Sequence, residues 1–319
     1  MTHELPTPAK PLKIGTRGSP LALAQAHEVR QRLGVAFDLP SEAFEIVVIR
    51  TTGDDAALIA KDKPLKELGG KGLFTKEIEE QLLSGGIDVA VHSMKDMPVA
   101  QPGGLMLDCY LPREDVRDAL IAPGLKRLGD MPKGAVVGTS SLRRRAQVLA
   151  ARPDLRVVEF RGNVQTRLRK LEDGVAACTF LAMAGLRRLG RSDVPATPMA
   201  PEEMLPAVAQ GAIGIERREG DSPVGEMLEA IHHRETADRL AAERAFLAEL
   251  DGSCETPIAG LAELDGGSLR LRGEILRPDG SERHADETTG AIEDGAEIGR
   301  AMARRLLERA GPGFFDWRV

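Results

Sequence analysis

Residues 12–33, LKIGTRGSPLALAQAHEVRQRL, begin with a short strand and continue into a helix that starts at Ser19-Pro20. Ser is a preferred N-cap and Pro is favoured at the first helical position, so this pair marks the start of the helix. The same order of strand, Gly-Thr and hydroxyl residue at a helix start returns in residues 134–152, GAVVGTSSLRRRAQVLAAR. The two stretches predict two α/β units of similar architecture.

Strands and helices alternate outward from both stretches, which indicates mainly parallel sheets. Further strands are expected at 44–51, 87–93, 156–160 and 177–182, and further helices at 75–83 and from Asn163 to Gly174. Two helical stretches follow residue 222. Beyond Cys254, segments joined by Asp-Gly-Gly and Pro-Asp-Gly turns predict antiparallel strands, and a helix at about 292–309 closes a small α+β region.

Composition excludes several classes of protein. The net charge is −6, so the protein has no overall positive field that would attract nucleic acid. Aromatic residues are 3%, too few to provide the platforms on which bases stack. The first eleven residues, MTHELPTPAKP, lack the apolar core of a secretory signal, and no apolar run is long enough to span a membrane. The three cysteines, Cys109, Cys178 and Cys254, are widely spaced and predict neither a metal site nor a disulfide framework. We therefore expect a cytoplasmic protein.

Basic residues cluster where strands lead into helices. Arg143-Arg144-Arg145 follows Thr139-Ser140-Ser141, Arg161 precedes Asn163 with Arg167 in the helix beyond, and Arg17 lies beside Ser19. Helix N-termini attract anions, and ligands of open α/β sheets bind at the carboxyl ends of strands. Any one of these arginines could be a solvated helix-face residue. Three such junctions together predict a site for carboxylates or phosphates.

Three further segments carry reactive groups. Residues 92–98, HSMKDMP, place Asp96 directly after a strand, where it is either held for acid-base or electrostatic work or paired on the surface with Lys95. Gly69-Gly70-Lys71-Gly72 lacks the Ser or Thr of a P-loop and is interpreted as a lid. Cys254, in a turn with Gly252, is either a small buried residue or a reactive thiolate.

In this order the motifs resemble the porphobilinogen deaminase family, whose members are also called hydroxymethylbilane synthases. The matching stretches are GTRGSPLALAQAH (15–27), GGKGLFTKEIE (69–79), DVAVHSMKDMP (88–98), GTSSLRRRAQ (138–147), RGNVQTRLRKL (161–171), LAMAGLRRLG (181–190), QGAIGIE (210–216) and DGSCETPIA (251–259). The resemblance runs from about residue 13 to 260 and continues more weakly to the end.

The resemblance implies two lobes like those of type II solute-binding proteins, an active site in the cleft between them, and a third small α+β domain that carries the cofactor cysteine. Applied to this chain, the domains are 1–111 completed by 212–230, then 112–211, then 231–319. The family is expected to act as a monomer, without a metal ion, a nucleic-acid partner or a membrane.

The resemblance also implies a reaction. Porphobilinogen loses ammonia, and the resulting electrophile is attacked by the free α-carbon of a chain that grows from dipyrromethane, a primer bound through a thioether to Cys254. Four units are added before the linear tetrapyrrole hydroxymethylbilane is released. Asp96 matches the catalytic aspartate. The residues matching the cofactor site are Lys95, Thr139, Ser141, Arg143 and Arg144, and those matching the substrate site are Arg17, Ser19, Ser93, Ser140, Arg161, Arg167 and Arg188.

The chain departs from the family pattern at two places. Ala177-Cys178 replaces Asp-Ala before LAMAG, and Ala209 replaces Gly before Gln-Gly. Ala209 is expected to restrict the backbone where the chain crosses between lobes. Two rival functions remain open at this point: a non-catalytic anion receptor, which would bind reversibly without Cys254, and a nucleic-acid binder acting through the Arg143 cluster, which salt titration would test.

Overall fold

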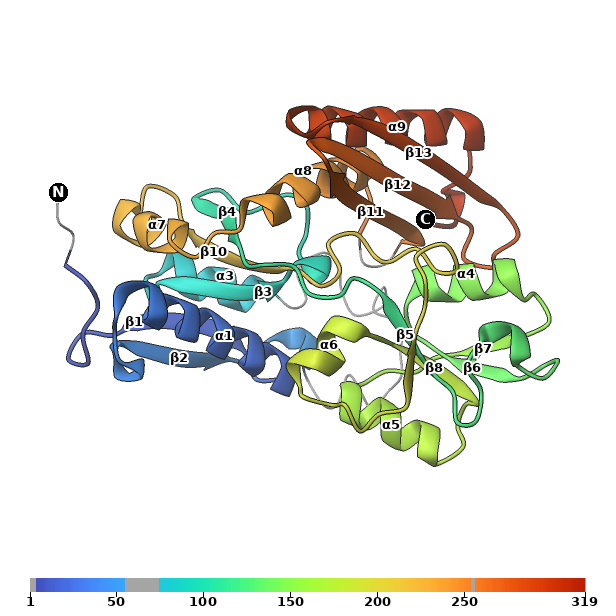
Figure 1. The fold of residues 1–319 in the computed structure, drawn as a ribbon, viewed down its shortest axis with the longest axis horizontal. Helices are drawn as coiled ribbons and strands as arrows, with labels where there is room; N and C mark the ends of the chain where they lie inside the picture. The colour runs from blue at the N-terminus through green and yellow to red at the C-terminus, as the bar shows by residue number, and fades with distance from the viewer. Residues whose placement is uncertain (1–3, 55–74, 254–255, 319) are drawn as a thin grey trace. The chain divides into compact units, whose positions relative to one another are not determined.

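The computed structural model describes residues 4–54, 75–253 and 256–318 (Figure 1). The chain divides into two compact units. The first contains the described residues up to 114 together with 212–237, and the second contains 115–211 and the described residues from 238 onward. The expected lid at 69–72 and Cys254 lie outside the described residues. The division into three domains stays a prediction, and each unit is described by itself below.

The first unit is built on one sheet, in the order β2-β1-β3-β10-β4. Its strands and longer helices are β1 (Leu12–Arg17), α1 (Pro20–Phe37), β2 (Phe44–Ile49), α3 (Lys76–Leu83), β3 (Val89–Ser93), β4 (Leu105–Tyr110), β10 (Ile213–Arg218) and α7 (Ser222–Glu229). Strand β1 is parallel to β2 and β3, whereas β10 runs antiparallel to β3 and β4. The buried face includes Ile14 of β1, Val29 and Leu33 of α1, and Ile213 of β10.

The second unit contains a sheet with the order β7-β6-β8-β5-β9. Its elements are β5 (Asp118–Ile121), β6 (Val136–Gly138), α4 (Leu142–Ala151), β7 (Arg156–Val158), α5 (Val164–Glu172), β8 (Cys178–Ala182), α6 (Met183–Arg188) and β9 (Ala196–Pro198). Strand β6 is parallel to β7 and β8, and β5 is antiparallel to β8 and β9. One core cluster of this unit includes Val137, Val148 and Phe180.

The same unit contains a three-stranded antiparallel sheet. It is formed by β11 (Ile258–Asp265), β12 (Ser268–Leu276) and β13 (Arg283–Ala291), and α9 (Gly295–Ala310) runs along it (Figure 1). Helix α8 (Arg234–Glu249) contributes Phe246, which meets Gly273 of β12 together with Met302 of α9.

The short 3-10 helices of the two units are η1 (Ser41–Ala43), η2 (Thr52–Asp54), η4 (Met94–Asp96), η5 (Leu128–Asp130), η6 (Ile292–Asp294) and η7 (Asp316–Arg318).

The α/β class and the small α+β region are confirmed, and the helix starts fall where the capping residues predict them. The Ser19 side chain accepts a hydrogen bond from Ala22 N, Ser141 from Arg144 N, and Asn163 from Thr166 N. Each cap satisfies one of the amide groups that a helix N-terminus leaves without an intrahelical partner. Of the helices within the described ranges, none combines the length and the hydropathy of a segment that could cross a bilayer.

The expected strands are parallel to one another, as predicted. The two five-stranded sheets are nevertheless mixed, because further strands join them in the antiparallel direction. The sequence did not predict β4, β5, β9 or β10. Strand β9 is only three residues long, and β10 pairs with partners more than 100 positions earlier, such as His92 opposite Gly214. Local alternation signals strands of average length, and no local pattern specifies long-range pairing.

The departure at Ala209 has a structural cost. Ala209 is fully buried at φ 59°, a left-handed conformation in which Cβ is disfavoured. We expect Ala209→Gly to raise the free energy of unfolding by about 1 kcal/mol. This is a net value, because glycine also gives the unfolded chain more conformational freedom, which offsets part of the relief of strain. A thermal melt should show a rise of about 2 °C.

Ala184→Gly is the matched control, because Ala184 is also buried but lies in the regular helix α6. There the same change should lower the free energy of unfolding by about 1 kcal/mol. If both variants melt below the wild type, backbone strain at Ala209 is not the dominant effect.

Candidate active site

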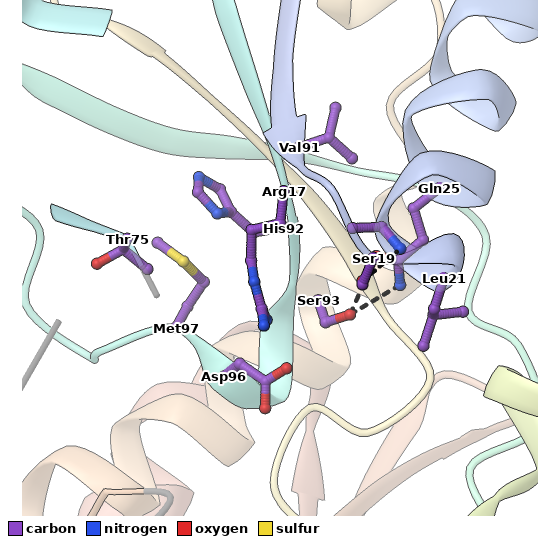
Figure 2. A pocket seen from close by; sticks show the side chains of 11 residues that line it. Arg17, Ser19, Leu21, Gln25, Thr75, Val91, His92, Ser93, Asp96 and Met97 are labelled. Atoms are coloured by element: carbon purple, nitrogen blue, oxygen red, sulfur yellow. Dashed lines mark hydrogen bonds between the residues drawn. The ribbon is translucent and has the colours of Figure 1, made fainter. Parts of the chain in front are cut away.

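A pocket in the first unit collects residues that follow two neighbouring strands. It is lined by Arg17 at the end of β1, Ser19 at the start of α1, Ser93 at the end of β3 and Asp96 in η4 (Figure 2). Strands β1 and β3 are adjacent and parallel, so their carboxyl ends meet at one edge of the sheet. The structure therefore brings together the predicted Arg17, Ser19, Ser93 and Asp96. Lys95 is half-buried on the same turn as Asp96.

The N-terminus of α1 borders this pocket and fixes its polar groups. Leu21, Ala22 and Gln25 of α1 line it, and Gln25 exchanges two hydrogen bonds with Ser93 at 2.8 and 3.1 Å (Figure 2). The positive end of a helix and the guanidinium of Arg17 both favour an anion here. The half-buried Asp96 carboxylate faces the same space, so the pocket can hold a ligand with anionic groups at one place and a developing cation at another.

A buried pair lies behind the pocket. His92 also lines it, and its Nε2 is 3.1 Å from Oε2 of Glu216, whose side chain is 0% exposed. Burial raises the pKa of the nearby Glu79, and the charge of Glu216 adds to this effect. The sequence motifs predicted no role for Gln25 or Glu216. Both residues lie in elements with further polar and charged side chains, so their residue type alone does not single them out.

In the second unit, the hydroxyl residues before α4 hold the local backbone. Thr139 Oγ1 accepts from Ser141 N at 3.2 Å, Ser140 Oγ accepts from Phe160 N at 2.9 Å, and Ser141 caps the helix. Each hydroxyl group can still donate its own hydrogen. The start of α4 therefore combines a helix N-terminus with three hydroxyl groups, as the sequence predicts.

Arg143 and Arg144 are 4% and 5% exposed, and both bind Asp118 of β5. Arg143 Nη1 lies 2.8 Å from Asp118 Oδ2, and Arg144 Nη2 lies 2.7 Å from Oδ1. Arg144 also donates to Phe180 O at 2.8 Å, and Gln210 donates to Asp118 Oδ1 at 3.0 Å. Asp118 is the main partner that sequence analysis missed, because nothing in DVRDALIA distinguishes it from an ordinary strand residue.

Charge is not balanced within this group. Burial favours protonation of Asp118, but the charges of Arg143 and Arg144 outweigh it and hold the pKa of that carboxyl well below its usual range. Burial lowers the pKa of Arg143, which Asp118 opposes. Two guanidinium groups thus face one carboxylate, and Arg143 Nε is a buried donor without a partner among the described residues. This arrangement fits an additional anionic ligand.

The remaining predicted arginines lie on other junctions of the second unit. Arg161 is 8% exposed and precedes Gly162, which has φ 117°. Arg167 of α5 donates to Gly162 O at 2.9 Å, and Arg188 at the end of α6 donates to Gly211 O at 3.0 Å. A Cβ at Gly162 would approach Thr166 Cγ2 to 2.6 Å, so both conformation and space require glycine there.

Asp118→Asn should lower the free energy of unfolding at pH 7 by about 3 kcal/mol, because it leaves two buried guanidinium groups without their counter-ion. A carboxyl whose pKa falls on folding stabilises the protein above its unfolded pKa of about 4, and this contribution is lost as pH falls further. The difference between wild type and variant should therefore shrink below about pH 4. Urea unfolding at several pH values measures it.

Asp193→Asn provides the control, because Asp193 forms an exposed pair with Arg191. An exposed pair contributes little to stability, so its unfolding curve should match that of the wild type. A difference between Asp118→Asn and wild type that is constant from pH 7 to pH 3 would contradict the depressed pKa of Asp118.

Comparison with known proteins gives the following relationships. Residues 12–226 match the family described as "Porphobilinogen deaminase, dipyromethane cofactor binding domain", and residues 237–308 match "Porphobilinogen deaminase, C-terminal domain". Over 314 residues the chain is 63% identical to a porphobilinogen deaminase of Paracoccus denitrificans, covering 98% of this chain and 99% of the relative.

Solved structures show more distant likenesses. The periplasmic VFT2 domain of BvgS from Bordetella pertussis is 14% identical, with a TM-score of 0.41, and the match covers 73% of this chain and 92% of that domain. The alkanesulfonate-binding protein SsuA from Xanthomonas axonopodis pv. citri is 16% identical, with a TM-score of 0.37 and coverage of 75% of this chain and 74% of the other.

Proposed function

The chain belongs to the porphobilinogen deaminase family, and we propose that the residues assembled in its two units serve one reaction, the stepwise joining of four porphobilinogen molecules into hydroxymethylbilane. In each step a C–N bond of the substrate breaks, ammonia leaves, and a C–C bond forms to the α-carbon of the growing chain, which gives up its proton. The protein is thus a transferase with dipyrromethane as its cofactor.

The observation that carries the mechanism is the placing of Asp96 and Arg17 in one pocket at the N-terminus of α1. Porphobilinogen carries an acetate, a propionate and an aminomethyl group. Arg17 and the helix N-terminus would bind a ring carboxylate, while Asp96 stabilises the positive charge that develops as ammonia leaves and moves the proton of the attacked carbon. Ser19 and Ser93 orient the ring, and Gln25 fixes the direction of the Ser93 hydroxyl.

Dipyrromethane supplies the first free α-carbon when it is bound through a thioether to Cys254. The cationic excess around Asp118 fits its carboxylates, as does Nε of Arg143, which has no partner in the part of the chain that the structure describes. We assign Arg143, Arg144 and Lys95 to those carboxylates, with hydroxyl donors from Thr139 and Ser141. Arg143 and Arg144 are already anchored by Asp118, so they would hold the primer without first having to be ordered.

Later rings bring further carboxylates, which need further cations. We assign Arg161, Arg167 and Arg188 to these rings, with a hydroxyl from Ser140. Arg161 directly precedes Gly162, whose positive φ favours glycine. Arg167 and Arg188 donate hydrogen bonds to the carbonyl oxygens of Gly162 and Gly211, which hold these two guanidinium groups against the backbone. Arginine suits this work because its planar fork can bind both oxygens of a carboxylate.

We also propose that the protein acts as a monomer in the cytoplasm. Cys109 and Cys178 are buried free thiols, which supports a reducing compartment. Size-exclusion chromatography with light scattering tests the monomer, and cell fractionation tests the location.

The intact mass of the purified protein tests the proposed function. The expected mass exceeds that of the polypeptide by two porphobilinogen units less the ammonia lost in attaching them. On incubation with porphobilinogen, further increments of one ring should appear and then disappear as product is released. A protein that binds porphobilinogen reversibly at the bare polypeptide mass, with no product, would be an anion receptor instead.

A further inference from the structure

A buried polar bridge joins the three-stranded sheet to the helix that carries Arg143. Glu274 of β12 is 1% exposed, and its Oε1 accepts a hydrogen bond from Nε2 of Gln147 in α4. Gln147 is 8% exposed, and its Oε1 accepts from Arg143 Nη1 at 2.9 Å. Gln147 Nε2 and Arg143 Nη1 also share the carbonyl oxygen of Leu205, at 2.9 and 3.0 Å.

The bridge has a direction, which Glu274, the carbonyl oxygen of Leu205 and Arg143 fix together. A carboxylate can only accept hydrogen bonds, so Gln147 must present its NH₂ group to Glu274. The amide oxygen of Gln147 is then left facing Arg143, which can only donate. With the amide reversed, two donor groups would face each other at Arg143 and two acceptors would meet at Glu274. A Gln at position 274 would leave this orientation in place, because Leu205 and Arg143 still impose it, but it would replace a charge-assisted hydrogen bond to Gln147 by a weaker neutral one.

The rest of this contact makes the geometry of the bridge rigid. Oε2 of Glu274 accepts from Nε of Arg283 in β13 at 2.6 Å, so the carboxylate is held from both sides. In the turn between β12 and β13, Gly280 approaches α4 so closely that a Cβ there would lie 2.4 Å from Ala150 N. Helix and sheet therefore meet backbone to backbone a short distance from the bridge.

We propose that Glu274 is a positioning residue for dipyrromethane binding, and that it acts through Gln147 to hold Arg143 in the orientation that receives the primer. This inference rests on the proposed function. The charged groups of the bridge and of its immediate partners are Glu274, Arg283, Arg143, Arg144 and Asp118. Glu274 attracts Arg143 electrostatically, and the hydrogen-bonded path from its carboxylate to the guanidinium runs through the Gln147 amide.

The rate of priming tests the proposal. Protein from a host that cannot make porphobilinogen is incubated with porphobilinogen, and the two-ring mass increment is followed by intact mass spectrometry. Glu274→Gln should prime about tenfold more slowly than wild type, and the half-saturating porphobilinogen concentration for priming should rise. Glu274→Asp, which can still only accept, should recover most of the rate.

A double-mutant comparison distinguishes positioning from general loosening. Gln147→Leu alone should slow priming to a similar extent, and adding Glu274→Gln to it should slow priming much less than tenfold, because only the direct attraction between Glu274 and Arg143 is then lost. Multiplied effects in the double variant, or Glu274→Gln priming at the wild-type rate, would overturn the proposal.

Asp286→Asn is the matched control. Asp286 lies on the adjacent strand β13, and its side chain is 14% exposed and paired with Arg305 and Arg309 of α9. It should prime like wild type even if its melting temperature falls. If the wild type itself gains no mass increment, the proposed function fails. If the wild type gains the increment and Glu274→Gln gains it equally fast, only the role of Glu274 is refuted.

Discussion

Cys254→Ala is expected to leave the purified protein at the mass of its polypeptide and to abolish hydroxymethylbilane formation. The reason is chemical. Without a thioether the primer has no covalent anchor, so any oligomer that forms can dissociate before four rings have been added. The expected loss is complete within the sensitivity of a product assay, because the reaction lacks its starting α-carbon and not merely a stabilising contact.

The other two cysteines provide matched controls. Burial raises the pKa of both Cys109 and Cys178 to about 12, so neither is a reactive thiolate at neutral pH. Cys109→Ala and Cys178→Ala should keep the mass increment and the activity, with a loss of stability of about 1 kcal/mol from the small cavity. An active Cys254→Ala protein, or a Cys178→Ala protein without the increment, would show that the attachment site is assigned wrongly.

The first-unit pocket was accessible from sequence for a geometric reason. Arg17 and Ser93 each end a strand, and Asp96 lies in the turn that follows β3. Apolar strand residues and a Ser-Pro helix start identify those strand ends locally. Parallel strands place their carboxyl ends at one edge of a sheet, so local signals predict that these side chains share that edge, and the pairing of β1 with β3 makes them neighbours there.

The network in the second unit was not accessible in the same way. Asp118 meets Arg143 and Arg144 from 25 and 26 positions away, on a strand that no sequence pattern marked. Glu274 reaches Gln147 across 127 positions. In the sequence, Asp118 and Glu274 are recognisable only as acidic residues, and acidic residues are usually exposed on the protein surface. What makes them structural is burial beside guanidinium groups, which depends on long-range packing.

This difference separates two kinds of residue in the site. Most of the residues proposed to bind the substrate or the primer lie at strand ends and helix starts, where the chain has recognisable local signals. Residues that contact those groups, such as Asp118, Gln147 and Gln25, belong to strands and helices. Gln25 and Gln147 stand in matching stretches, but their residue type alone predicts no particular contact. A motif search therefore identifies Arg143 but not the contacts that fix its guanidinium.

Asp96→Asn is expected to lower turnover by a factor of about 100 or more, which corresponds to about 2.7 kcal/mol of transition-state stabilisation. Asn keeps the shape of the side chain and can still form hydrogen bonds. It cannot neutralise a cation or accept a proton as a base, so the loss reports charge and not geometry. Asp96→Glu keeps the charge but displaces it by a methylene group. It should retain more activity and accumulate partly extended chains in the mass spectrum.

The fold should tolerate both changes, because Asp96 is half-buried in a short turn that faces a pocket. Thermal melts should match that of the wild type. Asp108→Asn is the control in the same unit, because Asp108 is 40% exposed in an ion pair with Arg217, and it should leave turnover unchanged. An Asp96→Asn protein that melts normally and makes the tetrapyrrole at nearly the wild-type rate would reduce Asp96 to a structural neighbour of Lys95. Slow turnover with a normal mass increment would instead place the defect in elongation, after the primer is attached, as expected for a carboxylate that acts on each ring in turn.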